Sequence, residues 1–490
     1  MPSTVSSLLK SLTTNKVIGY TITRYAVYGI QFVVSMLCAA KMGPYYYGVW
    51  GFIMMILSYI QRIDLGIPNA MNIILVQEKD SKQEFSKVQT TGFLLLLILC
   101  SCVIIFALGN VVWGYGFMEK YPIGPLFYIV CIIAALNYYV SACTGIYRVR
   151  HKLLEIAISQ SIIPFLLLIA LFVSDGQGLL LWFTLAYLVG NLASLLIFLF
   201  RGKLDFSVVP SIKMADRIIV KGFYLFLYNA CFYFIMISTR TIVSSNYPVE
   251  QFGYFTFAFS LADAVILLLG AFNFLMFPKV ICKLNSTDNQ QIKSTIKHLR
   301  NNYVSLVHVM MYFAFLLFPV FILMFPKYEP ALPALYMIGI ALIMETNASG
   351  YVDYLMAQNK DRLIAAFSGI VLVVNVVMAI VMVNVFHCSF AFVMVATLIS
   401  YWIFSILCVW AGLRKMRVRF TSLTVLNESF PARLLVPYAS TVLFFLLPSI
   451  WVLPIPLILF ALFNISIIKE LYNTFHHLLD NPNMLDVEGV

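Results

Sequence analysis

The stretch from Gly92 to Trp113 reads GFLLLLILCSCVIIFALGNVVW and contains no charged side chain. A helix needs roughly 20 mostly apolar residues to cross about 30 Å of hydrocarbon, so this stretch is long enough to span a membrane. The whole chain is similarly apolar, with 62% hydrophobic and 11% charged residues over 490 positions. Soluble domains are roughly half apolar and one quarter charged. The sequence therefore predicts an all-α polytopic membrane protein.

Apolar segments of similar length recur along the chain and predict about fourteen transmembrane helices in three groups. The predicted spans are 17–40, 45–76, 88–113, 122–148, 153–174 and 178–200, then 218–245, 250–278, 302–326, 329–357, 363–386 and 388–411, and finally 434–451 and 454–471. Polar stretches separate the groups. They divide the chain into a six-helix lobe over 1–217, a second six-helix lobe over 218–413, and a C-terminal helix pair with a polar tail over 414–490.

The positions of the basic residues predict the topology, because short cytoplasmic loops retain Lys and Arg while exported loops do not. Almost all of the 32 Lys and Arg residues fall in alternate loops when the N-terminus is placed inside. The exceptions are Lys41, Lys120 and Lys327 in predicted outer segments, and Arg24, Arg62 and Arg240 within spans. We therefore expect both termini on the cytoplasmic side of the membrane.

The net charge of +11 does not indicate a nucleic-acid-binding protein. The basic residues are spread over every predicted inner loop, whereas a nucleic-acid site gathers them into one patch. Topology and contact with anionic membrane lipids account for the charge.

The chain lacks the short motifs of common enzymes and metal sites. It has no Walker loop, no GxSxG, no HExxH and no CxxC, and most of its nine cysteines lie inside apolar spans. We therefore expect no catalytic residue, no metal and no cofactor, and we do not predict an enzyme.

An internal repeat relates the two six-helix groups. Aligning Gly48 with Gly253 pairs Tyr47-Gly48-Val49-Trp50 with Phe252-Gly253-Tyr254-Phe255, and it also pairs Tyr28 with Tyr233 and Phe52 with Phe257. Transporters are commonly built from duplicated halves. Because each repeat holds six spans, the repeat predicts two pseudo-symmetric lobes with the same orientation in the membrane.

The residues around the first repeat element resemble a known transporter family. Lys41-Met42-Gly43-Pro44-Tyr45-Tyr46-Tyr47-Gly48-Val49-Trp50, followed by Arg62-Ile63-Asp64-Leu65-Gly66-Ile67 and Ala70, resemble the opening of the Wzx-like polysaccharide-transport flippases of the MOP (multidrug, oligosaccharidyl-lipid, polysaccharide) superfamily. Phe252-Gly253-Tyr254 with Pro278 resembles the start of that family's second half. Asn375 and Ala396-Thr397-Leu398-Ile399-Ser400-Tyr401 resemble its eleventh and twelfth helices.

This resemblance implies two six-helix lobes facing a central cavity, with two peripheral C-terminal helices. It also implies alternating-access export of an undecaprenyl-diphosphate-linked oligosaccharide, as in O-antigen, lipopolysaccharide or capsule biosynthesis. Whether a glycan polymerase acts beside the protein is left open. The alternatives are a multidrug or organic-cation exporter of the same superfamily and a membrane glycan polymerase. The polymerase would need a large exported loop, and every predicted outer loop is short.

Charged residues within spans are candidates for function, because each costs roughly 2.5–3.5 kcal/mol at a helix centre unless it is paired or faces water. Arg24 lies about 10 Å along the first span. Its guanidinium suits a diphosphate, since it can donate two parallel hydrogen bonds. Tyr28, one turn away, would line the same substrate site. The alternative is an ion pair of Arg24 with Asp64 or Glu345.

The remaining candidates have two interpretations each. Arg62 is a candidate substrate-binding residue, and Asp64 is a candidate for ion coupling or a charge pair. Both stand beside Gly66 and Pro68, which can bend a span and so predict a hinge; a static ion pair is the alternative. Arg240 lies near the outer end of the seventh span. It is either a substrate ligand or a residue whose side chain reaches the membrane interface. The acids within spans could couple transport to an ion or pair with an arginine; these are Asp263, Glu345 and Asp353.

Overall fold

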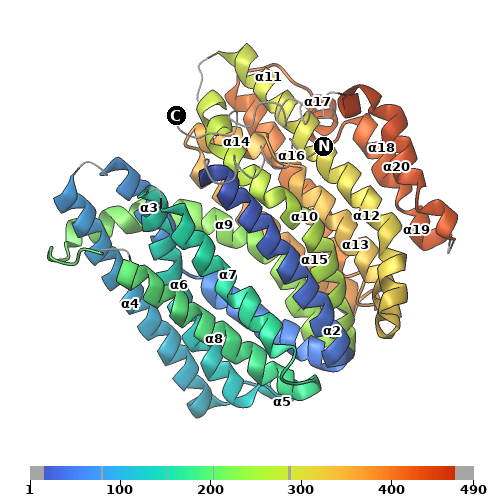
Figure 1. Cartoon of the computed structure of the whole chain (residues 1–490). Coiled ribbons are helices and arrows are strands. Elements are labelled where there is room, and N and C mark those ends of the chain that lie inside the picture. The colour runs from blue at the N-terminus through green and yellow to red at the C-terminus, as the bar shows by residue number, and fades with distance from the viewer. Residues whose placement is uncertain are drawn as a thin grey trace, which may run out of the picture. The chain divides into compact units, whose positions relative to one another are not determined.

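The computed structural model describes residues 16–78, 81–150, 152–201, 204–284, 288–447 and 449–469. Within these ranges the regular elements are helices and there is no strand (Figure 1). The chain divides into two compact units, Met1–Ala230 and Cys231–Val490, with the boundary inside helix α9. An all-α fold was predicted and is confirmed. The predicted domain boundaries after residues 217 and 413 stay predictions.

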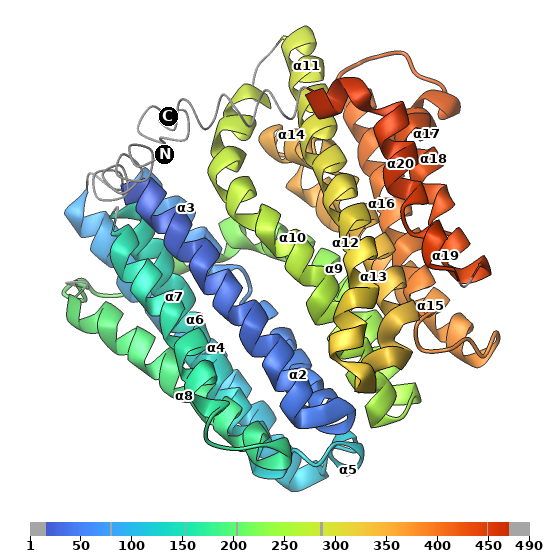
Figure 2. The same ribbon diagram turned by 45° about the vertical axis from the view of Figure 1, so that its right-hand side comes forward.

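Each unit is a bundle of long apolar helices. In the first unit α6, α7 and α8 lie side by side, and in the second unit α13 and α15 flank α16 while α20 lies along α12 and α18 (Figures 1 and 2). The first unit contains α2 (Lys16–Arg62), α3 (Ile67–Gln77), α4 (Lys82–Trp113), α5 (Phe117–Lys120), α6 (Gly124–Val149), α7 (Leu153–Ala170), α8 (Gly176–Arg201) and the start of α9 (Ile212–Asn246). The second continues with α10 (Val249–Leu284), α11 (Asn289–Leu299), α12 (Ser305–Met324), α13 (Leu332–Thr346), α14 (Tyr351–Ala357), α15 (Asp361–Asn384), α16 (Met394–Lys415), α17 (Ser422–Ser429), α18 (Ala432–Ser440), α19 (Leu443–Leu446) and α20 (Ile455–Phe463).

Helix α2 is two helical arms joined at Gly43. It has 47 residues, so a straight helix would be about 70 Å long, more than twice the hydrocarbon thickness of about 30 Å. Gly43 has φ 68° and ψ 172°, and Pro44 follows it. The Ser35 and Tyr47 hydroxyls are 3.1 Å apart although the residues are separated by 12 positions. In a straight helix those positions would be about 18 Å apart, so the chain changes direction at Gly43.

The number of long apolar helices differs from the fourteen predicted spans. The described residues contain 11 helices long and apolar enough to cross a membrane, or 12 if the bent pair Ser422–Ser429 and Ala432–Leu446 forms one span. The difference arises at the two ends of the chain. The first two predicted spans are partly merged in α2, which is counted once. The predicted spans 434–451 and 454–471 are interrupted after Ser440 and after Leu446, and α20 ends at Phe463. Residues 470 and 471 of the last span, with the polar tail, lie outside the described residues.

Ion pairs in the first unit join segments that were predicted on the same side of the membrane. The Lys41 ammonium lies 2.8 Å from an Asp175 carboxylate oxygen, and both residues belong to predicted outer segments. The Arg217 guanidinium lies 2.7 Å from Glu78, and both belong to predicted inner segments. Each contact agrees with the predicted side of its two segments, and the orientation of the unit in the membrane stays a prediction.

The same aromatic arrangement occurs in both units. Phe52 stacks on Tyr121 with ring centroids 3.9 Å apart and tilts against Phe117 at 5.7 Å. In the second unit Phe257 stacks on Tyr328 at 4.3 Å and tilts against Phe325 at 5.8 Å. Phe52 and Phe257 are the pair that the repeat aligns. Two triads of matching geometry support the duplication that the sequence predicted.

A close backbone contact between α3 and α9 holds the first unit together near its helix break. A Cβ atom on Gly66 would lie 2.7 Å from the carbonyl oxygen of Gly222, and one on Gly222 would lie 2.9 Å from that of Gly66. These separations are shorter than atoms tolerate, so both positions need glycine for the helices to approach. Gly66 also has φ 70°, a conformation that other residues rarely adopt.

We predict that Gly222→Ala lowers the thermal stability of the purified protein, because the added methyl group must displace the Gly66 backbone. Overpacking of this kind costs roughly 1–3 kcal/mol. Gly29→Ala is the matched control, since a Cβ there has no neighbour within 4 Å. It should leave the melting temperature in detergent unchanged or slightly raised, because alanine favours helix over glycine. Equal melting temperatures for Gly222→Ala and the unsubstituted protein would contradict the close contact.

Candidate functional site

Arg24 is held by neutral partners on the first unit. It lies more than two helical turns after the start of α2 at Lys16, about 12 Å along the axis. Its Nε–H group donates to the Tyr28 hydroxyl at 2.8 Å, its guanidinium lies 5.1 Å from the centre of the Tyr28 ring, and Nη1 donates to Gln160 Oε1 on α7. Among the described residues of this unit no carboxylate pairs with it, and Arg24, Tyr28 and Gln160 are all partly exposed.

This arrangement bears on the two interpretations of Arg24. An ion pair with Asp64 is not formed in the structure, since the Asp64 carboxylate accepts instead from the Gly66 amide at 2.8 Å. Two neutral acceptors orient the guanidinium and leave its positive charge uncompensated within the unit. A guanidinium in that state can still bind an anion. The substrate-binding roles of Arg24 and Tyr28 stay predictions.

The residues predicted as a hinge lie at an interruption between helices. Helix α2 ends at Arg62 and α3 begins at Ile67, and Leu65 between them has φ 51°. The Asp64 carboxylate caps the turn through the Gly66 amide, and Pro68 stands in the first turn of α3, where its missing N–H needs no partner. Arg62 and Asp64 lie close enough for their charges to interact. The break is present, and its movement as a hinge stays a prediction.

The second unit brings three of the predicted charged residues into one group. Arg240 on α9 is buried with its guanidinium 4.5 Å from the centre of the Phe259 ring. Its charge interacts with that of Asp263 on α10, and Asp263 interacts with Glu345 on α13. Both acids keep partly exposed side chains. Asp263 is therefore near both an arginine and a second carboxylate in a single unit, which is an arrangement that can hold a proton or a cation.

Two further residues named above have local partners. The Asp353 carboxylate accepts from the Gly350 amide at 3.0 Å in the first turn of α14, where it stabilises a helix start. The Asn375 side-chain amide on α15 donates to the Ile235 carbonyl at 2.8 Å and the Ser238 hydroxyl at 2.9 Å, both on α9. Asn375 thus fixes α9 close to Arg240. A coupling role for Asp353 stays a prediction.

Arg300 is a buried charged residue that the sequence analysis missed. It was assigned to an inner loop, but it is only 6% exposed and stands in a π-helical turn that leads into α12. Its guanidinium donates to the carbonyl oxygens of Asn347 at 2.7 Å and Ser429 at 2.8 Å, and it lies 5.6 Å from the centre of the Tyr351 ring. The Tyr351 hydroxyl in turn donates to Glu428 at 3.1 Å. Arg300 therefore joins α12, the break between α13 and α14, and the end of α17.

A helical pattern in the sequence could have indicated this burial. Ile292, Ile296, Arg300 and Val304 are spaced by four residues, and all four are buried. Positions at that spacing share one face of a helix. An arginine in line with buried apolar residues differs from a topogenic charge, which would face the lipid headgroups.

Comparison with known proteins gives the fold. No protein-family model matches the sequence, and no curated protein matches it. Among solved structures, an inward-facing multidrug resistance MATE family transporter of the MOP superfamily has a TM-score of 0.68 at 13% identity, covering 81% of this chain and 98% of its own. The lipid II flippase MurJ in an inward closed conformation has a TM-score of 0.67 at 16% identity, covering 94% and 99%. An outward-facing MATE family transporter has a TM-score of 0.62 at 13% identity, covering 82% and 95%.

The chain has the fold of the MOP superfamily. It is a multi-pass membrane protein whose similar structures are transporters and a flippase, and not enzymes. Such low identities relate the folds and do not transfer a substrate. The charged residues described above are therefore what distinguishes one possible function from another within this fold.

We predict that Arg300→Met lowers the folded yield in membranes, because two buried carbonyl oxygens lose a charged donor. Hydrogen bonds to charged groups contribute about 1.5–3 kcal/mol each. Arg419→Gln is the control, since Arg419 is exposed and belongs to the basic stretch predicted to set topology. The measurement is the monodisperse fraction after detergent extraction. A similar yield for the two variants would mean that Arg300 does not join these helices.

Proposed function

We propose that the protein is a flippase that moves a lipid-linked anionic oligosaccharide from the cytoplasmic to the outer leaflet of a bacterial inner membrane. An undecaprenyl-diphosphate carrier fits this proposal, with both termini of the protein in the cytoplasm and a central cationic passage that opens alternately to either side. The observation that carries the proposal is the state of Arg24. Its guanidinium lies on a membrane helix, is oriented by Tyr28 and Gln160, and pairs with no carboxylate among the described residues of its unit.

The uncompensated positive charge of Arg24 suits the binding of a diphosphate. A guanidinium within a membrane span is costly unless it meets water or an anion, so an unpaired one is best explained by a ligand that it binds during turnover. It can contact two phosphate oxygens at once.

The membrane potential favours the proposed direction without an exchanged cation. One charge that crosses 100 mV gains about 2.3 kcal/mol, so two negative charges leaving a negative-inside cytoplasm gain about 4–5 kcal/mol. The protein then has to supply a polar route for the headgroup and an opening for the lipid tail. Arg24 acts as the first binding group on that route.

We predict that Arg24→Ala abolishes most transport while the protein still inserts, and that Arg24→Lys keeps part of it. Lysine retains the charge but loses the planar geometry that binds two oxygens, and a lost charged contact corresponds to roughly tenfold or more in binding. The measurement is restoration of surface glycan in a flippase-deficient strain, normalised to membrane abundance. Arg419→Gln should behave like the unsubstituted protein.

The ion-pair explanation makes a different prediction with one more variant. If Arg24 served to neutralise Asp64, Arg24→Ala combined with Asp64→Asn would recover both abundance and transport, because no buried charge would be left uncompensated. We expect no recovery of transport. Full activity of Arg24→Ala at normal abundance would remove Arg24 from the substrate site.

A multidrug exporter is the second candidate, and the acids of the second unit favour it. Asp263 and Glu345 are partly exposed carboxylates that interact with each other, and such groups attract organic cations. In a drug-sensitive strain this function predicts raised tolerance to cationic dyes, which Asp263→Asn and Glu345→Gln would each remove. On the flippase proposal, expression leaves dye tolerance unchanged.

A further inference from the structure

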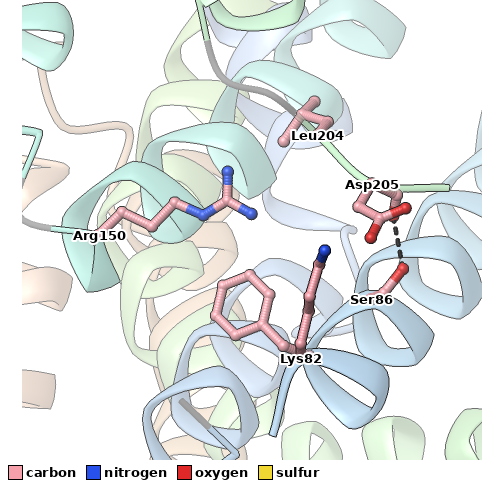
Figure 3. A pocket seen from close by; sticks show the side chains of 6 residues that line it. Lys82, Ser86, Arg150, Leu204 and Asp205 are labelled. Carbon is pink, nitrogen blue, oxygen red and sulfur yellow. Dashed lines mark hydrogen bonds between the residues drawn. The ribbon is translucent and has the colours of Figure 1, made fainter. Parts of the chain in front are cut away.

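A cavity of about 400 Å³ with three charged residues in its wall lies within the first unit, in segments distant in sequence from Arg24. It forms where α4 begins, where α6 ends, and where the chain leaves α8 toward α9. All three segments belong to the predicted cytoplasmic side. The side chains that line it are Lys82, Phe85, Ser86, Arg150, Leu204 and Asp205 (Figure 3).

The walls of this cavity are fixed by hydrogen bonds between α4 and the 204–211 linker. The Ser86 hydroxyl donates to the Asp205 carbonyl oxygen at 2.8 Å, and the Asp205 amide donates to Gln89 at 3.3 Å. The Ser211 amide donates to Thr91 at 3.2 Å. Ser86, Gln89 and Thr91 are at most 1% exposed, so these bonds are shielded from competing water. The linker backbone is therefore held in place against α4.

Positively and negatively charged side chains face the cavity from different sides. Arg150 and Lys82 point into the same space, and Asp205 faces it from the other side (Figure 3). The Arg150 guanidinium is placed over the Phe85 ring, 5.1 Å from its centre. Lys82 makes no ion pair with any described residue, whereas Lys87 on the same helix pairs with Glu84 at 2.6 Å. Hydrogen bonds from the Ser207 side chain and amide hold the pKa of Asp205 below its ordinary value, so it stays ionised.

We propose that this cavity binds the headgroup of a membrane phospholipid that carries both a phosphodiester and a free amine, the chemistry of phosphoethanolamine. Lys82 and Arg150 contact the phosphate oxygens, and the Asp205 carboxylate accepts from the ammonium group. A headgroup with a second negative charge or a neutral polyol in place of the amine leaves Asp205 without a partner. The site is independent of the substrate that the transporter moves.

The neighbouring surface favours a lipid over a free phosphate compound. The linker that carries Asp205 continues with Phe206, Val209 and Ile212, which are 46%, 78% and 91% exposed. Exposed apolar side chains beside a basic cavity at the membrane interface fit acyl chains below a headgroup. A soluble phosphate ester would make no use of them.

The test is native mass spectrometry of the full-length protein after it is loaded with phosphatidylethanolamine or phosphatidylglycerol in mixed micelles. We expect the unsubstituted protein to retain phosphatidylethanolamine preferentially. Lys82→Gln with Arg150→Gln should reduce the lipid-bound fraction roughly tenfold, since two charged contacts to phosphate are lost. Asp205→Asn should remove the preference while phosphatidylglycerol binding persists. Lys87→Gln is the matched control and should retain lipid like the unsubstituted protein.

Any one of the following results would overturn the proposal. Unchanged retention in the Lys82 and Arg150 double variant would show that the cavity does not hold the phosphate. A preference of the unsubstituted protein for phosphatidylglycerol, or an unchanged preference in Asp205→Asn, would remove the amine contact. Displacement of the lipid by inorganic phosphate alone would identify a site for a free anion. Melting temperatures of each variant without lipid separate loss of binding from loss of folding. If phosphatidylethanolamine still raises the melting temperature of a folded double variant, the result counts against the site.

Discussion

Backbone amide and carbonyl groups inside hydrocarbon have no water to bind, so each must find a partner within the protein. This constraint requires helices, and it also determines what happens where a helix is interrupted. At the break before α3, the Asp64 carboxylate accepts from the Gly66 amide. At the break between α13 and α14, Arg300 donates to the Asn347 carbonyl and Asp353 accepts from the Gly350 amide. Charged residues in this protein thus replace the hydrogen bonds that interrupted helices lose.

That use of charge separates structural residues from candidate functional ones. A carboxylate that caps a backbone amide, as Asp64 and Asp353 do, is explained by the fold even before a ligand is considered. Among the described residues, Asp263 and Glu345 cap no amide; Asp263 interacts with Arg240, and Glu345 interacts with Asp263. They are therefore the acids for which coupling is the stronger explanation. The matching aromatic triads around Phe52 and Phe257 support a common packing plan in the two units. The charged residues of the two units differ in spite of it.

The sequence predicted the helix type and the long apolar segments because hydrocarbon thickness sets a length that can be read directly. It predicted the helix ends less well. The turn at Gly43 falls in the gap between the predicted spans 17–40 and 45–76, but the break between Arg62 and Ile67 interrupts the second of these spans. The C-terminal segment is apolar throughout its helices, yet α18, α19 and α20 are short because the chain breaks between them. Mean apolarity does not record such breaks.

The candidate site was predicted in part. Arg24 stands out because it interrupts an apolar span, but its partner Gln160 on α7 is distant in sequence and has no charge to mark it. Arg300 was misassigned because it lies near a predicted span end, where a topogenic charge is also expected. Only the four-residue spacing from Ile292 to Val304 distinguishes a buried arginine from a topogenic one. This spacing is informative when the helix is known to continue from Ile292 through Val304.

Arg24 and Arg300 place the same kind of side chain in two different surroundings. A guanidinium has five N–H donors. Arg300 is 6% exposed and directs its donors at two backbone carbonyls from separate helices, so an anion could reach it only by pulling those helices apart. Arg24 directs Nε–H at Tyr28 and one Nη1–H at Gln160, both through side chains that can rotate, and it remains partly exposed. These two contacts use two of its five N–H donors. A carboxylate in place of Tyr28 or Gln160 would neutralise the charge of the Arg24 guanidinium and occupy its N–H donors. The neutral partners are therefore what make Arg24 suitable as an anion-binding residue.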